Sequence, residues 1–179
     1  GRVKRPVALR TAAVVGSETS ALEGQLDGLP DGYRADVAVI VVGGNDVTHR
    51  VPTSTSAAQL ETAVLRLRER GTEVVVGTCP DLGLLQPVPQ PLRSLGARMS
   101  RLLAAAQAEV AVRSGAHAVS LAHVVGPFFI TNPEEMFSLD NFHPSAAGYK
   151  RTAKALLPSV LAALGHTDEL PHGHHAPAV

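Results

Sequence analysis

A carboxylate stands three residues before a histidine near the end of the chain, in the run Asp140-Asn141-Phe142-His143-Pro144. On a turn that enters a helix, this spacing lets the Asp140 carboxylate reach the Nδ1–H of the His143 imidazole. That contact fixes the tautomer of the ring and leaves Nε2 free to act as a base. The alternative is a plain helix N-terminus, where Asp140 only caps backbone N–H groups and His143 only packs.

A second polar group follows an apolar stretch of the chain. Gly43-Gly44-Asn45-Asp46 comes directly after Asp36–Val42 (DVAVIVV). Two glycines permit an unusual turn and let a substrate approach the backbone closely. The Asn45 amide can then donate to a developing oxyanion, and the Asp46 carboxylate can hold the loop through bonds to backbone N–H groups. Ordinary turn chemistry is the competing explanation for the same four residues.

These residues need elements that place them, and the chain alternates β-branched runs with longer helical periods. The predicted strands are Val7–Val15, Asp36–Val42, Glu73–Gly77 and His117–Leu121. Two of the predicted helices are Ser17–Leu29 and a helix that begins with a Ser56/Gln59 capping box and ends before Gly71. A third is Leu92–Arg113, with Leu95 and Leu102 on its inner stripe. The last is Ser145–Leu164, which is expected to break at Pro158. The predicted irregular segments are Gly43–Thr55, Thr78–Pro91 and Ala122–His143. Strands that alternate with helices predict a parallel sheet covered on both faces, with its chemistry at the carboxyl ends of the strands.

Three signals in this order at predicted strand ends carry a family resemblance: Gly16, Gly43-Gly44-Asn45-Asp46 and Asp140-x-x-His143-Pro144. With them the chain resembles the SGNH (GDSL-type) hydrolase superfamily from Val7 to Leu164. The resemblance implies a flavodoxin-like three-layer α/β/α sandwich with a parallel sheet. It also implies that Gly16 and Asn45 donate to an oxyanion hole, that His143 is the general base, and that Asp140 is its orienting acid.

The family nucleophile is the serine of a Gly-Asp-Ser block, and this chain has no Gly-Asp-Ser. Ser17, directly after Gly16, is the nearest imitation and the alternative nucleophile. In the family, the first block lies further upstream of the asparagine block, with another strand between them. Ser17 is too close to Asn45 in sequence for that arrangement, so Gly16 fits the second family block. The first strand of the family fold is then missing from this chain. In a sheet of order 2-1-3-4-5 that strand lies between Val7–Val15 and Asp36–Val42. The expected partner is therefore a complementary N-terminal fragment that carries Gly-Asp-Ser and the serine.

Apolar residues gather just before His143. All four phenylalanines fall between residues 128 and 142, at Phe128, Phe129, Phe137 and Phe142. They suggest a wall for an acyl chain, since pockets for such ligands are mostly apolar. The alternative is a small satellite core under a long loop. With Gly44 and His49, the four phenylalanines are the candidate substrate-binding residues.

Composition excludes several classes of protein. The 179 residues fit one domain, predicted as a single N-terminally incomplete SGNH-like unit over residues 1–165 with a flexible histidine-rich tail over 166–179. Sixteen Lys and Arg balance sixteen Asp and Glu, so no basic excess for a nucleic-acid partner exists. No apolar run approaches the ~18–20 residues of a transmembrane segment. Cys79 is the only cysteine, which excludes an internal disulfide. The tail histidines lack neighbouring side chains that would orient them as metal ligands. No cofactor is implied. The cytoplasm and secretion both remain open as locations.

These signals predict a serine-type acyl ester hydrolase or acyltransferase that uses a Ser-His-Asp triad. The substrate is a small acyl ester, and the acceptor is water or a sugar or alcohol hydroxyl. The missing Gly-Asp-Ser favours an alternative, a catalytically degenerate SGNH domain that binds an acyl or carbohydrate ligand. A phosphate- or nucleotide-binding flavodoxin-like module ranks last, because the chain has no Gly-rich phosphate loop.

Overall fold

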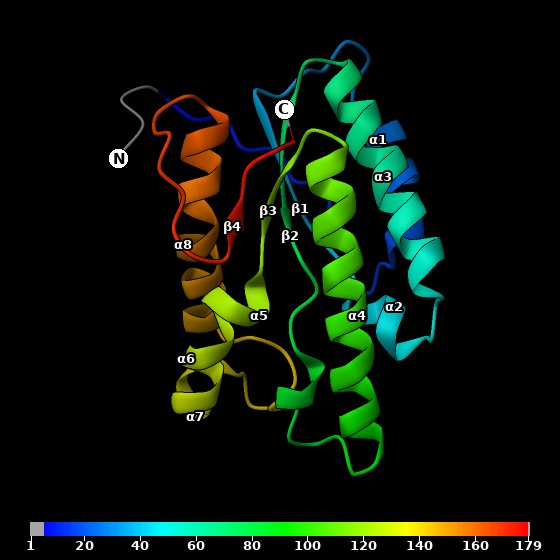
Figure 1. Ribbon diagram of the computed structural model, residues 1–179, viewed down its shortest axis with the longest axis vertical. Helices are drawn as coiled ribbons and strands as arrows, with labels where there is room; N and C mark the ends of the chain where they lie inside the picture. The colour runs from blue at the N-terminus through cyan, green and yellow to red at the C-terminus, as the bar shows by residue number, and fades with distance from the viewer. Residues whose placement is uncertain (1–5, 179) are drawn as a thin grey trace.

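The computed structural model describes residues 6–178, which form three layers with a sheet in the middle (Figure 1). The strands are β1 (Val37–Val41), β2 (Glu73–Gly77), β3 (His117–Val119) and β4 (His174–His175). They lie in the order β1-β2-β3-β4. The first three strands are parallel, and β4 runs antiparallel to β3. The predicted α/β class with a mostly parallel sheet is thus confirmed.

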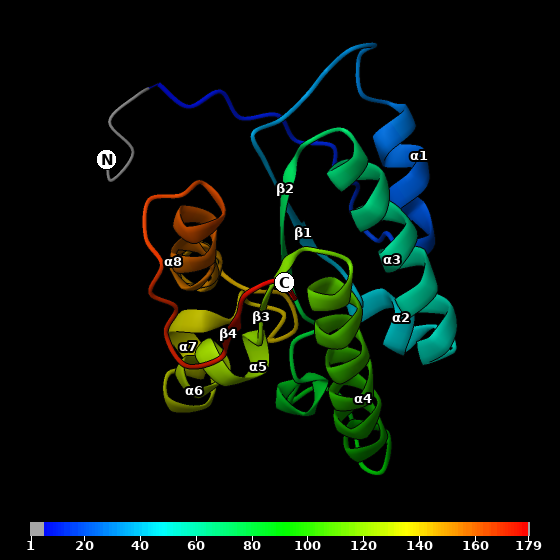
Figure 2. The ribbon, with the colours of Figure 1, turned by 45° about the horizontal axis from the view of Figure 1, so that its top comes forward.

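Helices cover both faces of this sheet (Figures 1 and 2). Packed on one side are α1 (Leu22–Asp27), α3 (Thr53–Glu69) and α4 (Leu92–Arg113). The other side carries α5 (Leu121–Val124), α6 (Gly126–Thr131), α7 (Pro133–Met136) and α8 (Ala146–Ala163). Short elements complete the set: the 3-10 turns η1 (Thr19–Ala21) and η2 (Leu82–Leu84), and helix α2 (Gly44–Thr48). None of the helices within residues 6–178 is long and apolar enough to cross a membrane.

The central strand β2 shows why the layers hold together. Val74, Val75 and Val76 are each fully buried. Because successive side chains of a strand point to opposite faces, Val74 and Val76 pack into the cluster with Leu60 of α3, whereas Val75 packs toward Leu156 of α8. This packing on both faces holds the sheet in place. Because its first three strands are parallel, their carboxyl ends share one edge of the sheet.

The predicted strand Val7–Val15 does not form. Residues 6–14 have no regular secondary structure, and Leu9 and Val15 are 89% and 101% exposed. An extended segment becomes a strand only beside another strand that takes up its hydrogen bonds, and within residues 6–178 β1 pairs with β2 alone. As a result β1 is an edge strand, and its Val39 and Val41 are half exposed.

Two helix boundaries also differ from the sequence prediction. The predicted loop Gly43–Thr55 contains α2, and α3 begins at Thr53, so Ser56 lies inside the helix rather than in a capping box. Its hydroxyl donates to Asp46 instead. At the other end of the chain, α8 runs without a break through Pro158. Leu156 and Leu161, both buried on either side of the proline, hold the helix together across the lost backbone hydrogen bond.

Segments predicted as irregular or flexible have structure of their own. The stretch Ala122–His143 contains α6, α7 and most of α5. The tail contributes β4: Ser120 N–H donates to the Gly173 carbonyl oxygen over 2.8 Å, and His174 Nδ1 lies 2.8 Å from the buried Ser159 Oγ. Residues near the end of the tail are therefore a structural part of the sheet.

Candidate active site

The Asp140–His143 contact predicted from sequence is present. His143 Nδ1 lies 2.6 Å from Asp140 Oδ2, and both side chains are open to solvent, with 65% and 49% of their surface exposed. A carboxylate only accepts hydrogen bonds, so the ring donates Nδ1–H, and in the neutral ring Nε2 then carries the lone pair. The Phe142 and imidazole rings pack edge to face, with 5.1 Å between their centroids. The arrangement leaves a basic nitrogen facing outward.

The rest of the loop holds this carboxylate in place. Asp140 Oδ1 accepts from the Ser138 hydroxyl over 2.6 Å and from the backbone N–H groups of Phe142 and His143 over 2.9 Å each. The hydrogen bond from His143, followed by that from Ser138, lowers the pKa of Asp140 well below its usual range. Asp140 therefore stays ionised to more acid pH than an ordinary aspartate, and it loses this stabilised charge only as pH falls through the lowered pKa.

Local sequence explains how the loop enters α8. The Ser145 hydroxyl caps the helix by accepting from Gly148 N–H over 3.1 Å, and it donates to the Glu135 carbonyl oxygen. A Cβ on Gly148 would overlap the Met136 carbonyl oxygen, so only glycine lets α8 lie this close to α7. Ser145 N–H also donates to the same Met136 oxygen over 2.8 Å. The serine and glycine behind His143 thus fix the position of the loop.

The turn after β1 depends on Gly43. Its φ of 122° suits glycine alone, and a Cβ there would lie 2.9 Å from Gln107 Nε2. Gln107, buried on α4, accepts from Cys79 N–H over 2.7 Å and donates to the Val42 carbonyl oxygen over 3.0 Å. It ties together the chain after β1 and the chain after β2. Sequence analysis missed this residue, although a glutamine within the apolar pattern of a helix was the available signal.

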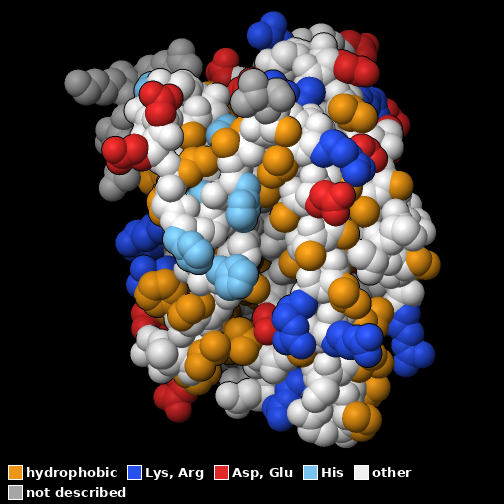
Figure 3. Space-filling model, viewed as in Figure 1, with side chains coloured by type: hydrophobic (Ala, Val, Ile, Leu, Met, Phe, Trp, Pro, Cys, Tyr) orange, Lys and Arg blue, Asp and Glu red, His pale blue; other side chains and the backbone are white. Residues whose placement is uncertain are grey.

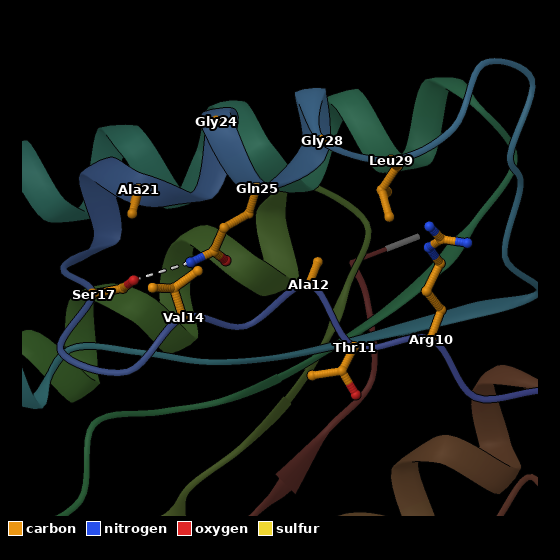
Figure 4. A pocket seen from close by; sticks show the side chains of 10 residues that line it. All are labelled: Arg10, Thr11, Ala12, Val14, Ser17, Ala21, Gly24, Gln25, Gly28 and Leu29. Carbon is orange, nitrogen blue, oxygen red and sulfur yellow. Dashed lines mark hydrogen bonds between the residues drawn. The ribbon is translucent and has the colours of Figure 1, made fainter.

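Asn45, at the start of α2, contacts the residue that follows Gly16. The Asn45 Nδ2 donates to the Ser17 carbonyl oxygen over 3.0 Å, which leaves the second amide hydrogen for another acceptor. Gly16 has a φ of 80°, and in the described part of the chain its N–H makes no hydrogen bond. The Ser17 hydroxyl accepts from Gln25 Nε2 over 3.1 Å, beside a cavity of about 520 Å³ between residues 10–17 and α1 (Figure 4).

Asp46 locks this corner together, as the sequence predicts. It is fully buried, and its carboxylate accepts from Thr19 N–H at 3.0 Å and from the Ser56 hydroxyl at 2.6 Å. The two bonds join the loop after Gly16 to α2 and α3. A buried carboxylate with donors on two other elements fixes where Asn45 stands relative to that loop.

Asp46→Ala is expected to lower the free energy of unfolding by about 3 kcal/mol, because it leaves the Thr19 N–H and the Ser56 hydroxyl buried without an acceptor. Urea denaturation followed by circular dichroism measures this. Asp168→Ala, at an exposed aspartate of the tail, is the control and should change stability by no more than about 0.5 kcal/mol. An Asp46 loss no larger than that of the control would contradict the structural role.

The candidate substrate-binding residues do not form one wall. Phe137 is buried and meets Phe129 edge to face at 4.8 Å, so these two rings form part of the core beneath α8. Phe128 lies under the guanidinium of Arg151 instead, and only Phe142 stands beside His143. The predicted acyl wall of four phenylalanines is therefore corrected, because close packing takes two of the rings into the interior.

Other candidate residues have clear surroundings. His49 Nδ1 lies 2.6 Å from Glu18 Oε1 next to the Asn45 corner, and a Cβ on Gly44 would meet open space. Burial raises the pKa of the Cys79 thiol to about 12, with Asp46 and Asp81 adding to the shift, so it is not a thiolate at neutral pH. Within residues 6–178 no three metal-binding side chains are grouped to hold an ion.

The described residues thus contain two half-sites, one with Asp140 and His143 and one with Gly16 and Asn45. No hydrogen bond among the described residues joins His143 to Asn45 or to Ser17. Helix α2, which carries Asn45, and helix α7, after which the Asp140–His143 loop begins, both lie in the lower half of the view in Figure 1. The chemistry available is a proton-accepting imidazole, an ionised carboxylate behind it, and two N–H donors.

An α/β sheet with a histidine–carboxylate pair and an asparagine loop at one end is typical of α/β hydrolytic enzymes. Comparison with known proteins agrees: the model of the GDSL-like lipase/acylhydrolase family matches residues 1–151. The chain therefore belongs to the GDSL-like lipase/acylhydrolase family, and the SGNH resemblance of its sequence is confirmed. The match includes both half-sites.

A relative from Mycobacterium tuberculosis, named GDSL-like esterase Rv1075c, is 41% identical over 166 residues. The alignment covers 92% of this chain and 53% of that protein, so the chain spans about half the length of its curated relative. Two crystal structures share the fold at 18% identity. LAE5, an α/β hydrolase enzyme from the metagenome of Lake Arreo, matches 86% of this chain and 71% of its own at a TM-score of 0.65. The crystal structure of a protein described as a putative GDSL-like lipase from Parabacteroides merdae matches 85% of this chain and 70% of its own at a TM-score of 0.61.

Proposed function

We propose that the chain supplies the base and the oxyanion hole of a serine-type acyl ester hydrolase. The observation that carries this proposal is the contact of His143 Nδ1 with Asp140 Oδ2 at 2.6 Å. In the neutral ring this contact places the hydrogen on Nδ1, so that Nε2 can take the proton of an attacking serine hydroxyl. The Asp140 carboxylate, whose pKa is lowered, then stabilises the imidazolium that forms.

The negative charge of the tetrahedral intermediate goes to the second half-site. One Asn45 amide hydrogen is held by the Ser17 carbonyl, and the other is available to the oxyanion. The Gly16 N–H is the second donor, because its positive φ turns the backbone and no acceptor in the described chain takes it. Donors held rigidly before the reaction stabilise a developing charge strongly. Asp46 and Gln107 supply that rigidity.

The nucleophilic serine comes, in this proposal, from a segment upstream of this chain that carries Gly-Asp-Ser. Ser17 is less suitable, because its hydroxyl is engaged by Gln25 and shares no contact with His143. The edge of β1 offers the place where such a segment would add as a strand, since Val39 and Val41 are half exposed there. Apolar surface on an unpaired edge strand favours a covering partner.

We further propose that the acyl acceptor is water, which makes the enzyme a hydrolase rather than an acyltransferase. A transferase must keep water away from its acyl intermediate and hold a second hydroxyl in its place. The His143 side chain is 65% exposed in the described chain. A small acyl ester is the substrate class that fits an exposed site of this kind.

Ester hydrolysis by the protein with its upstream segment tests this function, with p-nitrophenyl butyrate as substrate. Asn45→Ala should lower kcat by about 100- to 1000-fold and change KM little, because the lost hydrogen bond acts mainly on the oxyanion. Asn132→Ala, at an exposed asparagine that belongs to neither half-site, is the control and should leave kcat unchanged. A kcat for Asn45→Ala within threefold of the unchanged protein would contradict the proposed oxyanion hole.

A further inference from the structure

A cavity of about 320 Å³ lies between α8, the segment of α5 and α6, and the tail that forms β4. Its charged and imidazole lining residues are Arg151, Lys154, His123, His172 and His174. No aspartate or glutamate lines it. Histidine side chains gather on this face of the molecule, with Lys and Arg side chains at the left edge (Figure 3). The chain as a whole has no net charge, so this cavity is a local concentration of positive charge.

Two side chains that line the cavity, those of Arg151 and Lys154, carry permanent positive charges. The Arg151 guanidinium lies 3.9 Å above the centroid of the Phe128 ring, which holds the group by stacking and leaves its N–H edge free to donate. Neither Arg151 nor Lys154 takes part in an ion pair with any other described residue. The positive charges of these two side chains are therefore not neutralised by ion pairs that stabilise the fold.

Two histidines are held by serine hydroxyls through one ring nitrogen. His123 Nδ1 lies 2.7 Å from Ser120 Oγ, and His174 Nδ1 lies 2.8 Å from Ser159 Oγ. A hydroxyl that donates to Nδ1 leaves the hydrogen of the neutral ring on Nε2, which then acts as a donor. Burial lowers the pKa of His174, with the nearby His175 adding to the shift, which keeps this ring neutral. In the tautomer that accepts from the serine hydroxyl, each of the two histidines thus adds an Nε2–H donor to the two cations.

We propose that this cavity binds the phosphate group of a small, soluble phosphate monoester. Two permanent cations match the double negative charge of a phosphate monoester, and the planar edge of Arg151 fits two of its oxygens. The apolar remainder of the lining, Val124, Ala155 and Pro158, takes the carbon part of the ligand. The cavity contains none of the proposed base or oxyanion residues, so the inference does not rest on the proposed function.

Isothermal titration calorimetry of the whole protein with glycerol 1-phosphate at low ionic strength tests the proposal. The expected Kd is about 1 mM or tighter. The double substitution Arg151→Gln and Lys154→Gln should weaken binding by at least about tenfold, because it removes both charge-assisted contacts. Lys150→Gln is the matched control, an exposed lysine on the same helix outside the cavity, and should leave the Kd unchanged.

Two further arms separate the sources of phosphate. Inorganic phosphate should bind more weakly than glycerol 1-phosphate, since it lacks a carbon part to contact Pro158. Vesicles that contain phosphatidic acid should not retain the protein. Retention by these vesicles without binding of the soluble ester would overturn the proposal, as would equal weakening by Lys150→Gln and the double substitution. Circular dichroism checks that every variant is folded.

Discussion

His143→Ala is expected to lower the kcat of ester hydrolysis by about four orders of magnitude in the protein that carries its upstream segment. A serine hydroxyl is a weak nucleophile unless a base takes its proton, and the proposed base is His143, whose Nδ1 lies beside the ionised Asp140 carboxylate. Residual activity would come from the oxyanion hole and from substrate binding. Steady-state kinetics with p-nitrophenyl butyrate gives the number.

The surroundings of His143 separate this effect from a loss of folding. The side chain is 65% exposed, so its removal should change the free energy of unfolding by no more than about 0.5 kcal/mol. His166→Ala, at an exposed histidine just beyond α8, is the control and should keep full activity. A loss of less than tenfold for His143→Ala would mean that another group acts as the base.

The Asp140–His143 contact was predictable because it is local. Its three-residue spacing, the proline after the histidine and the serine that caps α8 all lie within six residues, so short-range geometry decides it. The strand Glu73–Gly77 and the strand predicted as Asp36–Val42, observed as Val37–Val41, were predictable for a similar reason, since each is an almost uninterrupted apolar run. Strand β2 is covered on both faces as that pattern predicts, whereas β1 is half exposed.

Contacts between distant segments could not be predicted in this way. Leu95 and Leu102 fit an inner stripe of α4 by their spacing, yet they are 46% and 55% exposed, whereas Gln107 of the same helix is fully buried. Gln107 is buried because two backbone groups form hydrogen bonds with its side chain. One is the carbonyl oxygen of the residue after β1, and the other is the N–H of a residue in the loop after β2. Only the arrangement of the whole sheet brings those two backbone groups within hydrogen-bond distance of the same side chain.

The predicted strand Val7–Val15 was wrong for the converse reason. Its valines and leucine have the composition of a strand, but β propensity describes how side chains fit a half-buried sheet and does not itself supply a neighbour. In the described chain no strand lies beside it, and its apolar side chains remain in solvent. The same missing neighbour leaves one edge of β1 open, which motivates the last prediction.

A segment upstream of this chain is expected to cover the open edge of β1, and the protein that includes it should hydrolyse esters whereas residues 1–179 alone should not. The reason is twofold. The proposed serine is absent from the shorter chain, and a strand added to β1 would pair its free N–H and C=O groups and bury Val39 and Val41. Replacing the serine of an upstream Gly-Asp-Ser with alanine should abolish the activity of the longer protein.

A pair of matched substitutions locates the covering segment without reference to activity. Val39 on β1 is 49% exposed in this structure, and Leu65 on the outer face of α3 is 44% exposed. If the segment covers β1, Val39→Lys should destabilise the longer protein by about 2–3 kcal/mol, because it buries an unpaired charge. Leu65→Lys should cost no more than about 0.5 kcal/mol in either protein.

The shorter chain completes this comparison. With its edge open, Val39→Lys places the ammonium in water, where a lysine on an edge strand is well tolerated, so its cost in residues 1–179 should match that of Leu65→Lys. Urea denaturation of the four variants measures all of these costs. Equal costs for the two substitutions in the longer protein would show that β1 keeps a free edge there. The serine would then have to reach His143 by a route other than a strand added beside Val39.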